Sequence, residues 1–197
     1  MTDIDPGAGA PTTLQTTTAS DVTSWTHTGL TPNTQYTFEV AATNAYGDSA
    51  KTTAYSMWTL ALNPVAPVVN GAARNSLNVT VGPGDGNPGA TVYAIYCTTT
   101  GQWVQPGGAP GASAAWQTAT DWGTTTATGL AEYTNYAFTV TARNGANLES
   151  SAGPPVSAMT LDATPPTGTV VINSGAAYAN TTDVALTLTY DDGTGSG

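Results

Sequence analysis

The feature that most constrains this chain is a pattern that occurs twice, one hundred residues apart. Residues 29–44 read GLTPNTQYTFEVAATN, and residues 129–144 read GLAEYTNYAFTVTARN. Apolar and polar residues alternate within both copies, which is typical of a β-strand with one buried face. The apolar positions are Tyr36, Phe38, Val40 and Ala42 in the first copy, and Tyr136, Phe138, Val140 and Ala142 in the second. The repeat therefore predicts a series of similar all-β units.

Each copy is followed by a turn and by a second strand-like run. The turns read NAYGDS at 44–49 and NGANLES at 144–150. Asn and Gly accept the left-handed backbone that a tight hairpin turn requires. The runs KTTAYSMWTL and PVSAMTL follow these turns, so each copy predicts two antiparallel strands.

The spacing from Leu30 through Tyr36 to Asn44 resembles the corner between strands E and F of a fibronectin type III domain. That family folds as a two-sheet, seven-stranded sandwich of about one hundred residues. The resemblance implies that Tyr36 and Tyr136 are corner tyrosines whose hydroxyls bond to nearby backbone. It also implies that Leu30 and Leu130 hold the corners. In the second copy Glu132 replaces Pro32, so we expect a less rigid corner there.

Residues 63–163 carry enough strand-like runs for a complete fibronectin type III domain. A Pro-punctuated linker, NPVAPVV, opens this region at 63–69. The inward positions expected from alternation are Leu77, Val79, Val81, Tyr93, Ile95 and Cys97. The family usually has Trp at the position of Val81, so the resemblance implies a core repacked by another large residue. The candidates are Trp103, Trp116 and Trp122.

The two ends of the chain predict incomplete units. Residues 1–62 resemble the later part of a fibronectin type III domain, roughly strands C′, E, F and G. Residues 164–197 resemble the start of a bacterial Ig-like repeat, with Val184, Leu186, Leu188 and Tyr190 on one face. The expected fold class is therefore all-β, with tandem antiparallel β-sandwiches that are incomplete at both ends.

Incomplete sandwiches expose apolar residues and unpaired strand edges. In the first unit we expect exposure of Trp25, Leu30, Tyr36 and Phe38. One interpretation is that the sequence is an excerpt of a longer repeat protein. The other is that neighbouring subunits complete each other's sandwiches by strand complementation, which would build a filament.

The charge balance limits the partners. Three basic residues oppose thirteen acidic ones, giving a net charge of −10. Such a surface repels nucleic acid and anionic lipid, and no apolar stretch is long enough for membrane insertion. The few charged residues and the abundance of Thr and Gly favour an extracellular protein, at a bacterial cell surface.

Catalytic chemistry has little support in the sequence. His27 is the sole histidine and is expected to pack on a strand, while Cys97 is expected to be buried in the core. The carboxylates are scattered, and a small sandwich has no cleft in which two of them would face each other. We therefore predict that the chain is not an enzyme.

Two kinds of ligand site remain as predictions. Asp85 in GDGNPG (84–89), and Asp191 and Asp192 in DDGTGSG (191–197), are weak calcium candidates, because calcium binds carboxylate and carbonyl oxygens. Acidic Gly-rich loops are more often solvated turns, and no other cofactor is indicated. Trp103 and Trp116 flank a long loop and are the candidates for stacking on a glycan, with core packing as the alternative.

The function expected from this pattern is a non-enzymatic structural module. It would act as a spacer or fibre-forming array in an extracellular bacterial surface or filament protein. Its partners would be neighbouring domains or identical subunits, bound through sheet edges. The alternative is an accessory or carbohydrate-binding region of a secreted polysaccharide-degrading enzyme, with polysaccharide as the partner.

Overall fold

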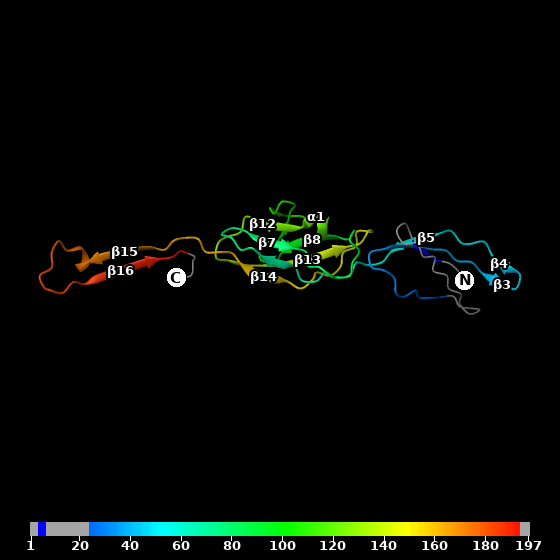
Figure 1. The fold of residues 1–197 in the computed structure, drawn as a ribbon, viewed down its shortest axis with the longest axis horizontal. Coiled ribbons are helices and arrows are strands. Elements are labelled where there is room, and N and C mark those ends of the chain that lie inside the picture. Colours follow the sequence, from blue (N-terminus) through cyan, green and yellow to red (C-terminus); the bar gives the residue numbers. More distant parts are fainter. Residues whose placement is uncertain (1–3, 7–23, 194–197) are drawn as a thin grey trace.

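The computed structural model describes residues 4–6 and 24–193, which form three parts in a row (Figure 1). The N-terminal part is blue and cyan, the central part green and yellow, and the C-terminal hairpin orange and red. Every strand pairing in the described part is antiparallel, and the helices there are one short α-helix and one 3₁₀ turn. The predicted all-β, antiparallel fold class is confirmed. Within the described ranges no helix has the length and apolar composition that a membrane crossing requires.

The central part is a sandwich of two sheets. The first sheet has the order β12 (Thr124–Ala127), β7 (Leu77–Thr80), β6 (Val68–Asn70). The second has the order β10 (Pro110–Gly111), β9 (Gln102–Val104), β8 (Val92–Cys97), β13 (Asn135–Arg143), β14 (Val156–Met159). A further strand, β11 (Gln117–Thr118), also pairs with β8, and the helix α1 (Ala119–Trp122) follows it directly.

The alternating residues of both sheets meet in one core. The side chains of Leu77, Val79, Ile95 and Phe138 are fully buried there. Trp122 also lies in this core, and its Nε1 donates a hydrogen bond to the Tyr93 carbonyl over 2.8 Å. Of the three tryptophans considered for repacking the core, Trp122 is therefore the one that enters it.

The N-terminal part is built on a three-stranded sheet, β1 (Ile4–Pro6), β2 (Gln35–Phe38), β5 (Tyr55–Trp58). A tight hairpin, β3 (Thr43–Asn44) and β4 (Gly47–Asp48), extends from it. β1 pairs with β2 as β8 pairs with β13, since Ile4 is opposite Phe38 and Cys97 is opposite Phe138. The strand next to β2 thus corresponds to the end of strand C. The assignment of residues 1–62 to strands C′, E, F and G stays a prediction.

The expected exposure of the N-terminal part holds for some residues only. Trp25 is 45% exposed, and Leu30 and Phe38 are half-buried, whereas Tyr36 is only 5% exposed. Tyr36 was predicted to be exposed because the first strands are missing. Its burial has a local cause, because the corner folds back until the Thr31 N–H reaches the Tyr36 hydroxyl. His27 lies outside any strand, with its ring centroid 5.0 Å from that of Trp25.

The C-terminal part is a hairpin of β15 (Thr167–Ile172) and β16 (Leu186–Asp191), with the 3₁₀ turn η1 (Asn173–Gly175) after β15. Val170 is paired with Leu188, and Ile172 with Leu186, so one face of the hairpin is apolar. All of its strand residues are exposed. The two strands predicted here are present, and their assignment to an Ig-like repeat stays a prediction.

Candidate functional site

The residue types used in catalysis and metal binding are dispersed. In the described part of the chain no three His, Cys, Asp or Glu side chains gather as metal ligands. Cys97 is a free thiol that is 4% exposed in the central core. His27 has its Nδ1 3.1 Å from the carbonyl oxygen of Thr28. The structure therefore brings neither residue together with a partner for nucleophilic chemistry.

Asp85, one of the calcium candidates, organises a loop. Its Oδ1 accepts from the Asn87 backbone N–H over 2.9 Å, and its Oδ2 accepts from the Asn87 amide over 2.8 Å and the Tyr93 hydroxyl over 2.7 Å. Burial of the Tyr93 phenol, together with the hydrogen bond and negative charge of Asp85, raises the pKa of Tyr93. Asn87 in turn bonds the backbone N–H and carbonyl of Leu62. Asp85 thus holds its loop against the end of the N-terminal part.

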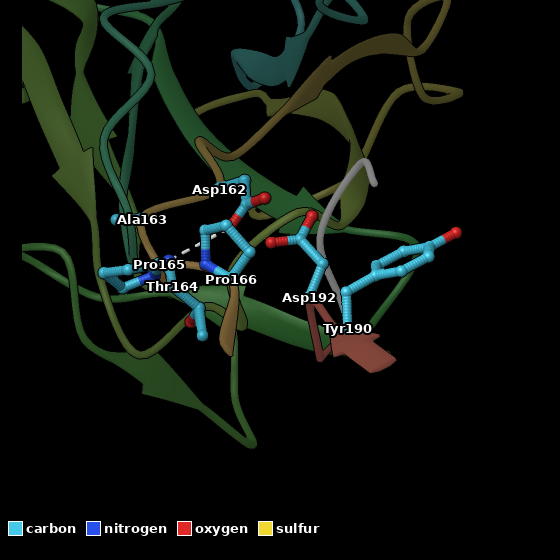
Figure 2. A pocket seen from close by; sticks show the side chains of 7 residues that line it. All are labelled: Asp162, Ala163, Thr164, Pro165, Pro166, Tyr190 and Asp192. Carbon is cyan, nitrogen blue, oxygen red and sulfur yellow. Dashed lines mark hydrogen bonds between the residues drawn. The ribbon is translucent and has the colours of Figure 1, made fainter. Parts of the chain in front are cut away.

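Asp191 and Asp192 lie at the C-terminal end of β16. The Oδ1 of Asp191 accepts a hydrogen bond from the Gly193 N–H over 2.8 Å. Asp192 lines a groove of about 520 Å³ between the hairpin and the linker that precedes it. Figure 2 shows the Asp192 carboxylate directed toward the linker and the Tyr190 ring directed away from it. The other groove residues are Asp162, Ala163, Thr164, Pro165 and Pro166. Residues 194–197 of the predicted loop lie outside the described residues, and calcium binding stays a prediction.

The two corner tyrosines make equivalent hydrogen bonds. The Tyr36 hydroxyl accepts from the Thr31 N–H over 2.9 Å, and the Tyr136 hydroxyl accepts from the Ala131 N–H over 2.8 Å. These are the backbone bonds that the resemblance implies. Near them, Leu130 is buried in the central core, whereas Leu30 is half-buried.

The replacement of Pro32 by Glu132 does not remove the bonds that hold the second corner. In both corners the hydroxyl of the Thr that directly follows the last strand accepts from a corner N–H over 3.0 Å. The same hydroxyls, of Thr59 and Thr160, donate to a corner carbonyl over 2.7 Å. The loosening that we expected from the missing proline is therefore not visible in the hydrogen bonds.

The first corner also contacts the next part of the chain through Asn33. Its amide nitrogen donates to the Thr91 hydroxyl over 2.8 Å, and its oxygen accepts from the Gly145 N–H over 2.9 Å. The Asn144 amide donates to the Thr59 carbonyl over 3.0 Å. We call these contacts the first junction. Asn33 was not predicted as a site residue, although it occupies a corner position with φ of 44°, which Asn tolerates better than most residues.

The second corner contacts the following linker through Glu132. Its Oε2 lies 2.8 Å from Nε of Arg74, and its Oε1 accepts a short hydrogen bond from the Thr164 hydroxyl. The Thr164 hydrogen bond and then that of Arg74 lower the pKa of Glu132. We call this group the second junction. Each corner thus directs one polar side chain at the part of the chain that follows, and the second does so through the residue that replaces proline.

The two candidate glycan-stacking tryptophans lie on one face of the central sandwich. Tyr93, Ile95 and Cys97 of β8 enter the core, so Val92, Ala94 and Tyr96 face the opposite way. Trp103 is paired with Tyr96, and Arg143 is paired with Val92. Directly opposite residues share a face, so these two side chains also point away from the core.

Trp116 joins this face through Arg143, whose guanidinium carbon lies 4.5 Å from the centroid of the Trp116 ring. At the other end the Tyr96 and Trp103 ring centroids are 4.7 Å apart with planes tilted by 53°. We call Tyr96, Trp103, Trp116 and Arg143 the outer aromatic face. All four residues are half-buried, so neither tryptophan is a core residue and neither is freely mobile in solvent.

Comparison with known proteins gives one curated relative and a set of similar structures. No protein-family model matches the sequence. Exoglucanase B of Cellulomonas fimi is 31% identical over 187 residues, which cover 89% of this chain and 16% of that protein. A two-domain fibronectin type III segment of chicken tenascin has a TM-score of 0.50 at 18% identity, covering 79% of each chain. Domains d3–d4 of the rat CD45 extracellular region have a TM-score of 0.44 at 22% identity, covering 76% of this chain and 75% of that one.

The comparison with the tenascin segment establishes the fold. The similarity to the tenascin segment shows a β-sandwich of the fibronectin type III kind, as the corner pattern predicted. The chain spans only 16% of the length of the exoglucanase that it matches.

Proposed function

We propose that this chain is a non-catalytic accessory region of a secreted polysaccharide-degrading enzyme, in which it acts as a spacer. The observation that carries the proposal is the extent of the match to Exoglucanase B. The match covers 89% of this chain but only 16% of that protein. The matching segment is thus a small part of Exoglucanase B. In the proposed enzyme the catalytic domain would lie outside the 197 residues.

The two junctions support a spacer with a defined shape. A flexible linker would let consecutive parts rotate freely. Here Asn33 and Asn144 hydrogen-bond across the first junction, and the Glu132 carboxylate bonds Arg74 and Thr164 at the second. A row of sandwiches joined in this way holds whatever is attached to its ends at a set distance.

The gene that encodes the chain provides the direct test. We expect its reading frame to encode a glycoside hydrolase catalytic domain as well, and the purified 197-residue chain to release no sugar from cellulose. A frame that encodes only repeated sandwiches and a cell-wall attachment signal would contradict the proposal. That result would favour the bacterial surface protein predicted from the sequence.

A second candidate function is a filament module, and a specific observation favours it. The apolar face of the C-terminal hairpin is exposed, with Leu186 59% and Leu188 73% exposed. A second copy or a neighbouring domain bound to this hairpin would cover those side chains. Light-scattering mass of the purified chain tests this candidate: a polymer supports it, and a monomer near 20 kDa contradicts it.

A further inference from the structure

We propose that the outer aromatic face of the central sandwich binds a neutral glucan chain. The choice of glucan rests on the proposed function, whereas the existence of the binding face rests on the geometry of four side chains. Those side chains are Tyr96 and Trp103 at one end and Trp116 and Arg143 at the other.

The aromatic rings supply the apolar part of the site. A pyranose ring presents C–H groups on its faces and hydroxyls around its edge, so it stacks on a flat aromatic ring and hydrogen-bonds at its rim. The Tyr96 ring packs against the Trp103 ring with centroids 4.7 Å apart, in the tilted arrangement that aromatic pairs prefer. This contact fixes the orientation of the Trp103 indole before any ligand binds, which reduces the entropy lost on binding.

Arg143 supplies the polar part. In the described part of the chain it makes no ion pair, although Glu149 lies opposite it on a β-bridge. Its Nε is buried and has no hydrogen-bond partner there. Buried donors are rarely left unpaired in proteins, and a guanidinium carries five of them. The stack on Trp116 holds the guanidinium in place. In the proposed site its terminal N–H groups would donate to the hydroxyl oxygens of the sugar.

The dimensions of the face fit a chain of sugars better than a single one. Trp103 is paired with Tyr96 and Arg143 with Val92, so the two ends are four residues apart along β8. Four residues of a strand span roughly 13 Å. Between the two ends lies the pair of Ala94 and Thr141, whose small side chains also face away from the core.

The charge of the protein selects a neutral ligand. A net charge of −10 repels polysaccharides rich in uronate or sulfate. The first repeat has Thr43 at the position of Arg143, one hundred residues earlier, so the arginine belongs to the central sandwich alone. One binding face per chain is therefore expected.

The test is retention of the 197-residue chain by microcrystalline cellulose, with affinity electrophoresis in a soluble neutral β-glucan. We expect Trp103→Ala and Trp116→Ala each to weaken binding at least tenfold, and Arg143→Gln to weaken it several-fold. Trp103→Tyr, which keeps an aromatic ring, should retain most of the binding. The matched control is Trp25→Ala, which removes an exposed tryptophan from the N-terminal part and should leave binding unchanged.

Three outcomes would overturn the inference. They are no retention of the unaltered chain, retention by anionic polysaccharides only, and equal loss in Trp25→Ala. Unfolding curves followed by the NMR signal of the Trp122 indole N–H, which is hydrogen-bonded in the core, separate lost binding from lost folding. Failure here leaves the spacer proposal intact if the reading frame encodes a catalytic domain, so the two proposals fail independently.

Discussion

The central sandwich and the C-terminal hairpin carry the same kind of alternating strand but differ completely in burial. In β7, Leu77 and Val79 are fully buried, whereas in β16 Leu186 is 59% and Leu188 is 73% exposed. Both strands are paired in register with an antiparallel neighbour. The difference is the facing sheet, which covers β7 in the central part and which the described residues do not provide for the hairpin. Alternation defines a strand and its apolar face, and a facing sheet is needed to bury that face.

The two copies of the repeat show the same difference in burial between equivalent residues. Phe38 and Phe138 occupy equivalent positions, but Phe138 is fully buried and Phe38 is half-buried. Their corner hydrogen bonds are nearly identical, at 2.9 Å and 2.8 Å. The corner hydrogen bonds are therefore local, because they are the same in both repeats although the phenylalanine beside them is buried to different extents.

Replacement of Phe38 and Phe138 by alanine should reveal the largest difference in stability between the two repeats. Phe138→Ala should lower the free energy of unfolding of the central sandwich by about 3–5 kcal/mol, because it leaves a cavity in a closed core. Leu188→Ala on the exposed hairpin should change it by less than about 0.5 kcal/mol. Urea unfolding followed by the NMR signal of the Trp122 indole N–H, which lies in the central core, measures both. Phe38→Ala should lower the free energy of unfolding of the N-terminal part by less than Phe138→Ala lowers that of the central sandwich. An equal loss would show that the N-terminal part has a closed core too.

Alanine at Gly145 should disturb the first junction and leave the central core intact. A Cβ atom there would lie 2.3 Å from the Trp58 ring, so the ring or the whole N-terminal part must move. Overpacking of this kind costs roughly 1–3 kcal/mol. We expect the small-angle scattering profile of the chain to change. Gly89→Ala is the control, because its Cβ would have no atom within 4 Å, and an unchanged profile for both variants would contradict a rigid junction.

Loss of a corner hydroxyl should affect both repeats alike. Tyr136→Phe leaves the Ala131 N–H without its partner, and Tyr36→Phe does the same to Thr31. Each change should cost about 1 kcal/mol. Amide hydrogen exchange at Thr31 and Ala131 should become faster in the matching variant only. If neither amide responds, the hydroxyls do not hold the corners.

Acid should loosen the second junction without affecting the first. The pKa of Glu132 is lowered in the folded protein, so its contribution to stability is complete above the ordinary pKa of a glutamate. That contribution is lost as the pH falls through the lowered folded pKa. The effect should be small and should shrink in high salt, since the Arg74 side chain is 56% exposed. An NMR titration of the Glu132 side-chain carboxyl carbon tests this, and Thr164→Val should raise the pKa of Glu132 toward its ordinary value because it removes the hydroxyl that bonds the carboxylate.

Much of the site could be foreseen in outline but not in detail. The pattern around Leu30 and Tyr36 predicted the corner, because a short stretch of sequence contains all the groups that form it. The choice of Trp122 over Trp103 and Trp116 for the core was not predictable. It depends on α1 turning the Trp122 indole toward the Tyr93 carbonyl, which lies twenty-nine residues away. Asn33 and Glu132 were missed as junction residues for the same reason, since their partners lie in other parts of the chain.

By itself the sequence determined the strands, their apolar faces, the repeat and the sign of the charge, because each depends on residues close together in the chain. The tertiary structure alone decided which faces are covered, which tryptophan enters the core, and that Trp103 and Trp116 share a surface with Arg143. Those outcomes depend on strand pairing between distant segments, and pairing is set by the packing of whole sheets.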